Sequence, residues 1–417
     1  MFNKQNTLQA KGAAVLLMLC HHLFFFKDRI PLGSDMTTGI MISDWDLINI
    51  IGAFGKLCVG IFMFLGGYGL FCSYSSARKD PSGEKAGAFF LKRIIRIYKG
   101  YWKVFLIFIP IGFLFFSDQT PITQDQYIAG VFSNFQIKPV ISNFVLMVST
   151  INREWWFYRT YLFAVFLGLI FIQVFKNRKN IYVEFFTVAL FLMITRGPLP
   201  YLAAKEGMGL NGTFWYSNLL AIDDCAAAIM AGVIFAKYDI FKSWKKLFEK
   251  FTRPEKLVIS LLSIVLLAYV RTFILPIYTE AITVPVFITA LMLITDSFKP
   301  VGATFAFLGR FSTNIWLTHT FYCYYFTPVA KFIYKFDSPI AAFLITLALS
   351  LVTAILLDIF WKYLFIGVKK FRRGILDLYT KDEEEAPLPA GEAAALPKAK
   401  KDKKAESAKG NKDDQEK

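Results

Sequence analysis

Long apolar stretches recur along the chain and are separated by short polar segments. A helix needs about 20 mostly apolar residues to cross a bilayer, so this pattern predicts an all-α integral membrane protein, a bundle of about ten transmembrane helices. We expect these helices near residues 10–26, 50–75, 100–117, 156–175, 181–195, 216–237, 257–275, 279–296, 303–327 and 340–365. The more polar segment 118–155 is predicted to form a re-entrant or interfacial element.

Lysine and arginine are concentrated in one of the two alternating sets of loops. They are frequent in residues 78–99, 176–179, 242–256 and 369–373, and sparse in the alternate loops. Because basic residues accumulate in cytoplasmic loops, both termini are predicted to be cytoplasmic, as an even number of spans requires. We therefore predict one multi-pass domain over residues 1–375 in the plasma (cytoplasmic) membrane. Residues 376–417 are too polar to fold alone and are expected to form a disordered charged cytoplasmic tail.

The composition agrees with a membrane protein and excludes several other classes. Hydrophobic residues make up 55% of the chain and charged residues 19%. The formal net charge of +16 would suggest a nucleic-acid partner in a soluble protein, but here basic loops beside an anionic leaflet explain it. No nucleic acid is expected as a partner, and membrane lipids are. The 5 cysteines predict no disulfide framework, and no cluster of histidines or cysteines supports a metal site.

The first predicted helix carries two adjacent histidines, His21 and His22, although the chain has only 3 in all. An ionisable group inside a membrane helix is a functional-site hypothesis by default. Lys11 lies eleven residues before His22. On a helix this spacing brings the two side chains to within about 20° of one direction and about 16 Å apart along the axis. His22 is therefore the better aligned of the two histidines.

With this orientation, the other polar residues of the predicted helices fall into an outer and an inner layer. The outer layer mixes imidazoles with carboxylates, which together can stage proton transfer. Its members are the candidate catalytic residues His22, Asp223, Asp224, Glu154 and His319. A structural hydrogen bond is the alternative role of His319, and an ion pair with Arg271 or Arg159 is the alternative role of Asp223 or Asp224.

The inner layer is cationic and lies toward the cytoplasm. Arg93 and Arg96 are three residues apart on one helical face, and paired guanidinium groups suit phosphate oxygens. The candidate cofactor-binding residues are Lys11, Arg93, Arg96 and Arg310. The alternative is that these cations only anchor the helices at the cytoplasmic face and that Asp358 neutralises Arg310.

Five segments in order along the chain resemble motifs of the acyltransferase 3 family of integral membrane acyltransferases. They are Lys11 with ten intervening residues and His22, then Phe62-Met-Phe-Leu-Gly66-Gly67-Tyr68, Lys92-Arg93-Ile-Ile-Arg96, Trp155-Trp156-Phe157 and Asn314-Ile-Trp-Leu-Thr-His319. Two positions differ from the family pattern: Lys11 stands where arginine is usual, and Gly66 stands where serine is usual. The family histidine corresponds to His22 and its basic partner to Lys11.

The resemblance implies an O-acyltransferase that moves an acyl group, usually acetyl, from cytoplasmic acyl-coenzyme A to a hydroxyl of a cell-surface carbohydrate or lipid-linked glycan. Coenzyme A would dock on Lys11, Arg93 and Arg96, and His22 would act as general base or accept the acyl group transiently. Asp223, Asp224 or Glu154 would orient the imidazole.

Two other functions use similar intramembrane charges. A transporter or flippase for a lipid-linked sugar or a small acid would line its substrate path with them. A glycan polymerase or ligase also has about ten spans, but the outer loops here are shorter than such a protein needs. The acceptor, the acyl chain length and the oligomeric state are left open by the sequence.

Overall fold

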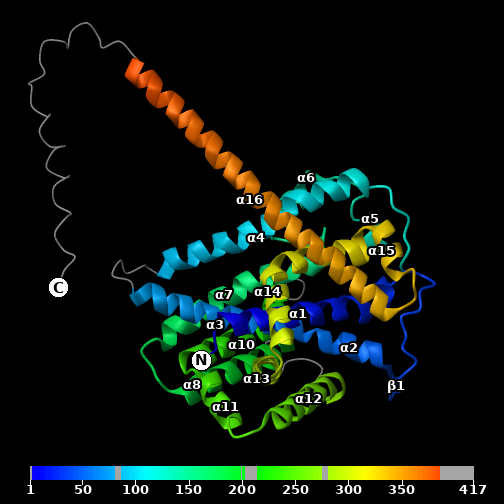
Figure 1. Cartoon of the computed structure of the whole chain (residues 1–417), viewed down its shortest axis with the longest axis vertical. Helices are drawn as coiled ribbons and strands as arrows, with labels where there is room; N and C mark the ends of the chain where they lie inside the picture. The colour runs from blue at the N-terminus through cyan, green and yellow to red at the C-terminus, as the bar shows by residue number, and fades with distance from the viewer. Residues whose placement is uncertain (1, 80–85, 199, 202–213, 275–279, 386–417) are drawn as a thin grey trace, which may run out of the picture. The chain divides into compact units, whose positions relative to one another are not determined.

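The computed structural model describes residues 2–79, 86–198, 200–201, 214–274 and 280–385 (Figure 1). Their secondary structure is helical apart from one short antiparallel hairpin, β1 (Met41–Ile42) and β2 (Trp45–Asp46). The chain divides into two compact units, Met1–Ile359 and Phe360–Lys417. The predicted all-α class is therefore confirmed for the residues that the structure describes.

The helices follow one another in the order α1 (Lys4–Phe24), α2 (Leu47–Gly55), α3 (Leu57–Lys79), α4 (Ala86–Phe115), α5 (Gln126–Gly130), α6 (Ile137–Phe144), α7 (Trp156–Phe175), α8 (Ile181–Arg196), α10 (Phe214–Lys237), α11 (Ile240–Phe248), α12 (Arg253–Tyr269), α13 (Glu280–Ser297), α14 (Lys299–Thr320), α15 (Thr327–Tyr334) and α16 (Pro339–Glu385). Short 3₁₀ turns form at Lys27–Arg29 and Arg153–Trp155, and π-helical turns at Val270–Ile274 and Phe321–Tyr325.

Within the described ranges, 6 helical stretches are long and apolar enough to cross a membrane. They are Leu47–Ala77, Ala86–Phe115, Arg153–Phe175, Arg253–Ile274, Glu280–Ser297 and Pro339–Arg373. The other four predicted spans correspond to α1, α8, α10 and α14. Helix α8 has only 16 residues, and α1 and α14 bury polar side chains that lower their hydropathy. The count of ten spans and the side of the termini stay predictions.

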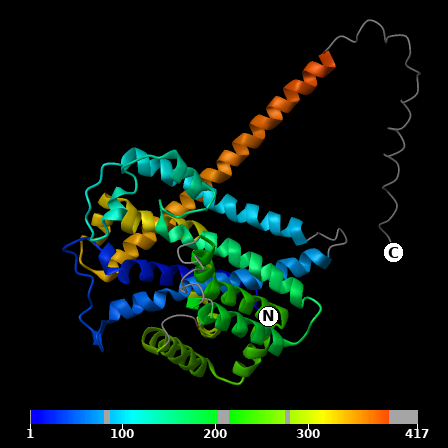
Figure 2. The same cartoon turned by 180° about the vertical axis from the view of Figure 1, so that it is seen from behind.

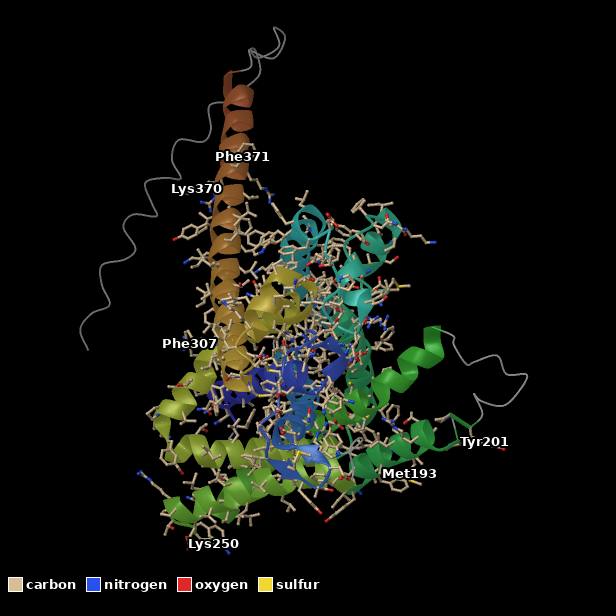
Figure 3. All side chains as sticks on the ribbon, turned by 90° about the vertical axis from the view of Figure 1, so that its right-hand side faces the viewer. Met193, Tyr201, Lys250, Phe307, Lys370 and Phe371 are labelled. Atoms are coloured by element: carbon tan, nitrogen blue, oxygen red, sulfur yellow. The ribbon has the colours of Figure 1, made fainter. Side chains whose placement is uncertain are left out.

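The outer surface of the first unit is rich in large apolar side chains. Met193, Tyr201 and Phe307 point away from their helices in Figure 3. A soluble protein seldom exposes so much apolar surface to water, whereas a membrane protein exposes such a surface to lipid. This surface agrees with the multi-pass membrane protein that the sequence predicts.

Helix α16 continues to Glu385, beyond the predicted domain boundary at residue 375. Residues 386–417, which make up most of the predicted tail, lie outside the described residues.

Helices α1 and α14 lie in close contact because glycines bring their backbones together. A Cβ atom at Gly12 would overlap the backbone carbonyl of Phe305, and one at Gly309 would overlap that of Leu8. Small residues allow this approach between membrane helices. The two glycines therefore fix how α1 and α14 face each other.

The same device joins α3 to α10, while α3 also packs against α7 (Figures 1 and 2). A Cβ atom at Gly67 would overlap the carbonyl of Ile229, and one at Gly232 would overlap that of Phe64. The glycines of the second predicted span thus permit close helix contact, as their spacing suggests.

We expect Gly309→Ala to lower the stability of the protein, because the added methyl group has no room against the backbone of α1. Overpacking of this kind costs about 1–3 kcal/mol and lowers the thermal midpoint measured in detergent. Gly87→Ala in α4 is the matched control, since nothing lies within 4 Å of a Cβ atom there. Equal midpoints for the two variants would contradict the close packing of α1 and α14.

Candidate active site

A cavity of about 370 Å³ lies between α1, α3, α4, α7 and α14. Three of its lining residues are cations, Lys11, Arg93 and Arg96. Aromatic rings form much of the remaining wall, from Phe62, Phe157, Tyr158, Tyr161 and Trp316. Three of the four predicted cofactor-binding residues therefore meet at one cavity, although they come from two helices far apart in the sequence. The fourth, Arg310, is exposed and is not among the lining residues.

Arg93 is held in place by α3 and α7. Its Nη2 donates to the carbonyl of Gly66 at 3.2 Å and lies 3.4 Å from the hydroxyl of Tyr161. Its Nη1 lies 3.4 Å from Oγ of Ser73. Its Nε is buried and has no hydrogen-bond partner among the residues described. The guanidinium is thus fixed at the cavity, where its positive charge suits it to binding an anion.

His22 and His319 meet where α1 and α14 approach each other beyond the cavity. Their ring centroids are 4.9 Å apart, and their exposed fractions are 8% and 0%. Nδ1 of His319 donates to the carbonyls of Ile315 (3.1 Å) and Trp316 (2.9 Å), so in the neutral ring Nε2 carries the free lone pair.

Both rings keep nitrogen atoms that the fold does not use. Nε2 of His319 and Nδ1 of His22 are buried and without a hydrogen-bond partner in the described part of the chain. Buried polar atoms are normally paired, so such atoms need an explanation. A pair of imidazoles with free nitrogens is able to accept and pass on a proton.

His21 has different partners from its neighbour. Its Nδ1 donates to the carbonyl of Gly52 in α2 at 2.8 Å, and its ring stacks on Phe25 with centroids 5.1 Å apart. His21 is therefore occupied in joining α1 to α2, while His22 faces His319.

A buried ion pair between Arg29 and Glu154 lies next to the histidine pair. The side chains are 14% and 6% exposed, and Oε2 of Glu154 also accepts a hydrogen bond from Tyr325 at 2.9 Å. Burial lowers the pKa of Arg29, but the Glu154 carboxylate outweighs this effect and holds that pKa above its ordinary value. Glu154, predicted to orient His22 directly, thus has its oxygens engaged by Arg29 and Tyr325.

The π-helical turn Phe321–Tyr325 connects this ion pair to α1. It closes with a bond of 2.7 Å from the backbone N–H of Phe326 to the carbonyl of Phe321, five residues earlier. Its Tyr324 donates to the backbone carbonyl of His22, and its Tyr325 donates to Glu154. Such π-turns are frequent at functional sites because they re-aim side chains. Sequence analysis missed Arg29 and both tyrosines.

The remaining predicted residues lie elsewhere or outside the described part. The backbone of Asp223 and Asp224 forms part of α10, but the structure does not describe their side chains. Arg271, one of their suggested partners, is buried and pairs with Glu280 at 3.0 Å.

Two further suggested partners are engaged with other groups. Nη1 of Arg159 donates to the carbonyl of Met147 at 2.9 Å. Asp358, suggested as the partner of Arg310, accepts a hydrogen bond from Nδ2 of Asn314 at 2.9 Å. In the described ranges, no three His, Cys, Asp or Glu side chains are grouped so as to hold a metal ion.

The fold and this site define a helical membrane protein with a cavity lined by cations, and comparison with known families identifies its class. A family model described as an acyltransferase domain, that of the acyltransferase 3 family, matches residues 9–359. The match covers most of the chain and ends with the first structural unit, Met1–Ile359. The chain therefore belongs to this family, as its motifs indicated. No curated protein and no solved structure matches the chain.

Proposed function

We propose that the protein transfers an acyl group, in the first place acetyl, from cytoplasmic acyl-coenzyme A to a hydroxyl of a cell-surface or lipid-linked carbohydrate. The observation that carries the proposal is the meeting of Lys11, Arg93 and Arg96 at one cavity beside a buried histidine pair. Phosphate groups need several cations, and acyl transfer to a hydroxyl needs a base. Helix α1 carries both a cation of the cavity, Lys11, and the proposed base, His22, which supports the proposal.

The cavity suits the donor in chemistry and is large enough to hold part of it. Its volume of about 370 Å³ is within the range of small-molecule sites. The three cations would bind the phosphates, with Arg93 already oriented by Gly66 and Tyr161. The aromatic wall would contact the pantetheine arm that carries the thioester toward the histidines.

The reaction requires one proton to move to the base and then to the leaving group. The acceptor oxygen attacks the thioester carbonyl carbon while its proton passes to the imidazole of His22. The tetrahedral intermediate then collapses, the carbon–sulfur bond breaks, and the thiolate leaves as the free thiol after taking the proton from His22. Nε2 of His319 would accept a hydrogen bond from the protonated His22 ring, because His319 donates through Nδ1 and the two ring centroids are 4.9 Å apart. The products are the carbohydrate ester and coenzyme A.

The decisive experiment uses the purified full-length protein in proteoliposomes with acetyl-coenzyme A and a cell-surface glycan extract. We expect release of free thiol that depends on the extract, together with acetyl label on the glycan. A transporter or flippase would move its substrate without consuming the thioester. No thiol release with acetyl-coenzyme A or with longer acyl donors would refute the proposal.

Arg93→Ala should raise the KM for acetyl-coenzyme A and leave kcat nearly unchanged, because the arginine binds the donor away from the reacting atoms. Hydrogen bonds to charged groups contribute about 1.5–3 kcal/mol to binding. The loss of one therefore raises the KM for acetyl-coenzyme A by about 10- to 100-fold. Initial rates against donor concentration measure the effect. Arg253→Ala, at an exposed position where α12 begins, is the control and should behave like the parent. Equal KM values for both variants would remove Arg93 from the donor site.

A further inference from the structure

Trp316 belongs both to the donor cavity and to the histidine pair. Its indole lines the cavity and is only 5% exposed, while its backbone carbonyl accepts the 2.9 Å hydrogen bond from Nδ1 of His319. His22 and His319 are not among the residues that line the cavity. Three residues of α14, about 4.5 Å of rise, therefore lead from the cavity wall at Trp316 to the imidazole at position 319.

Rings from three helices meet at this point. Phe62 of α3 lies 4.9 Å from Trp316 between centroids and is nearly perpendicular to it at 84°, and Phe157 of α7 lies 4.4 Å away. We call Phe62, Phe157 and Trp316 the three-ring cluster. All three residues line the cavity, and Trp316 is the lining residue nearest in sequence to His319.

The indole nitrogen of Trp316 is a donor without a partner. Nε1 is buried and makes no hydrogen bond to any residue that the structure describes. A buried tryptophan N–H usually finds an acceptor, and leaving one unpaired is costly. An acceptor supplied by a bound molecule would remove this cost.

We infer that Trp316 determines which acyl group the enzyme accepts. This inference rests on the proposed function, in which the donor occupies the cavity and the reaction takes place at His22. The acyl end of the donor must then pass the three-ring cluster, and the bulk of the indole restricts the passage to short acyl groups. Its Nε1–H donates to a carbonyl oxygen of the donor arm as the acyl group passes.

Transfer rates with acetyl-, butyryl- and hexanoyl-coenzyme A test the inference in the purified full-length protein. The parent should prefer the acetyl donor. Trp316→Ala should raise the hexanoyl-to-acetyl ratio of kcat/KM by about tenfold or more. The smaller side chain makes room for the extra methylene groups of the hexanoyl chain, and each methylene group that fits changes kcat/KM substantially. Trp316→Phe keeps a large ring and should keep the preference for the acetyl donor. It should lower kcat/KM for acetyl-coenzyme A by about tenfold, because the hydrogen bond from the indole N–H is lost.

Control variants separate this result from a general loss of packing. Trp244→Ala removes the same bulk from a different aromatic contact, with Phe235 at 5.2 Å, and should leave the donor preference unchanged. Trp316→Leu provides a milder reduction in size if the alanine variant does not fold. An unchanged hexanoyl-to-acetyl ratio in an active Trp316→Ala or Trp316→Leu variant would overturn the inference and leave the proposed function standing. A parent protein that turns over none of the donors would overturn both.

Discussion

Replacement of His22 by alanine should reduce acyl transfer by about a thousandfold while the protein still folds. General-base catalysis contributes about 10²–10⁴-fold to such reactions, and His22 is the imidazole on α1 that has an unused buried nitrogen and whose ring lies beside that of His319. The substitution removes no hydrogen bond between helices from the His22 side chain, so the cost in stability is that of a small core cavity. Incorporation of acetyl label into the glycan measures the rate, and the thermal midpoint in detergent measures folding.

His21→Ala is the matched control, one position away on the same helix. It removes the hydrogen bond to Gly52 and should cost about 1 kcal/mol of stability, but it should retain part of the activity. Activity of His22→Ala equal to that of the parent would end the assignment of His22. Equal losses in both variants would show that packing at the end of α1, rather than proton transfer, is affected.

Replacement of Glu154 by alanine should destabilise the protein by about 3–5 kcal/mol. The change leaves the buried guanidinium of Arg29 without its counter-ion, and an uncompensated buried charge is among the most costly defects in a protein. It also removes the acceptor of the Tyr325 hydroxyl, which lies on the same π-turn as Tyr324. We therefore expect a lower thermal midpoint and reduced activity in whatever protein still folds.

Two comparisons test the cause of this loss. The double variant Glu154→Leu with Arg29→Met removes both charges and should recover much of the stability. Lys245→Ala breaks an exposed ion pair with Asp296, whose side chains are 54% and 44% exposed, and should cost at most about 1 kcal/mol. A similar small loss for Glu154→Ala and Lys245→Ala would contradict the burial of the Arg29–Glu154 pair.

The apolar pattern predicted the positions of the helices better than their ends. Helix α7 was predicted at 156–175 and is observed at Trp156–Phe175. Helix α4 was predicted to begin near residue 100 but begins at Ala86, because basic residues at positions 92–99 interrupt the apolar pattern of its first half. Helix α12 begins at Arg253, where Thr252 and Glu255 form a capping box and a proline follows in the first turn. Capping residues would have placed that start correctly.

Helical spacing predicts which residues of one helix share a face, whereas contacts between distant segments were beyond it. The shared stripe of Lys11 and His22 follows from 3.6 residues per turn, and the cationic layer follows from the side of the membrane assigned to each loop. Arg29 and Glu154 lie 125 residues apart, and only the packed bundle brings them together. The unusual Gly66 also has a physical reason, because a Cβ atom there would overlap the ring of Tyr161.

The hydrogen bonds of His319 to its own helix have a consequence for how the enzyme works. Since the ring is tied to the carbonyls of Ile315 and Trp316, the imidazole and the indole belong to a single stiff turn of α14. Under the proposed function, the ring at the cavity wall and the proton acceptor therefore belong to one helical segment, and no loop has to move to bring them together.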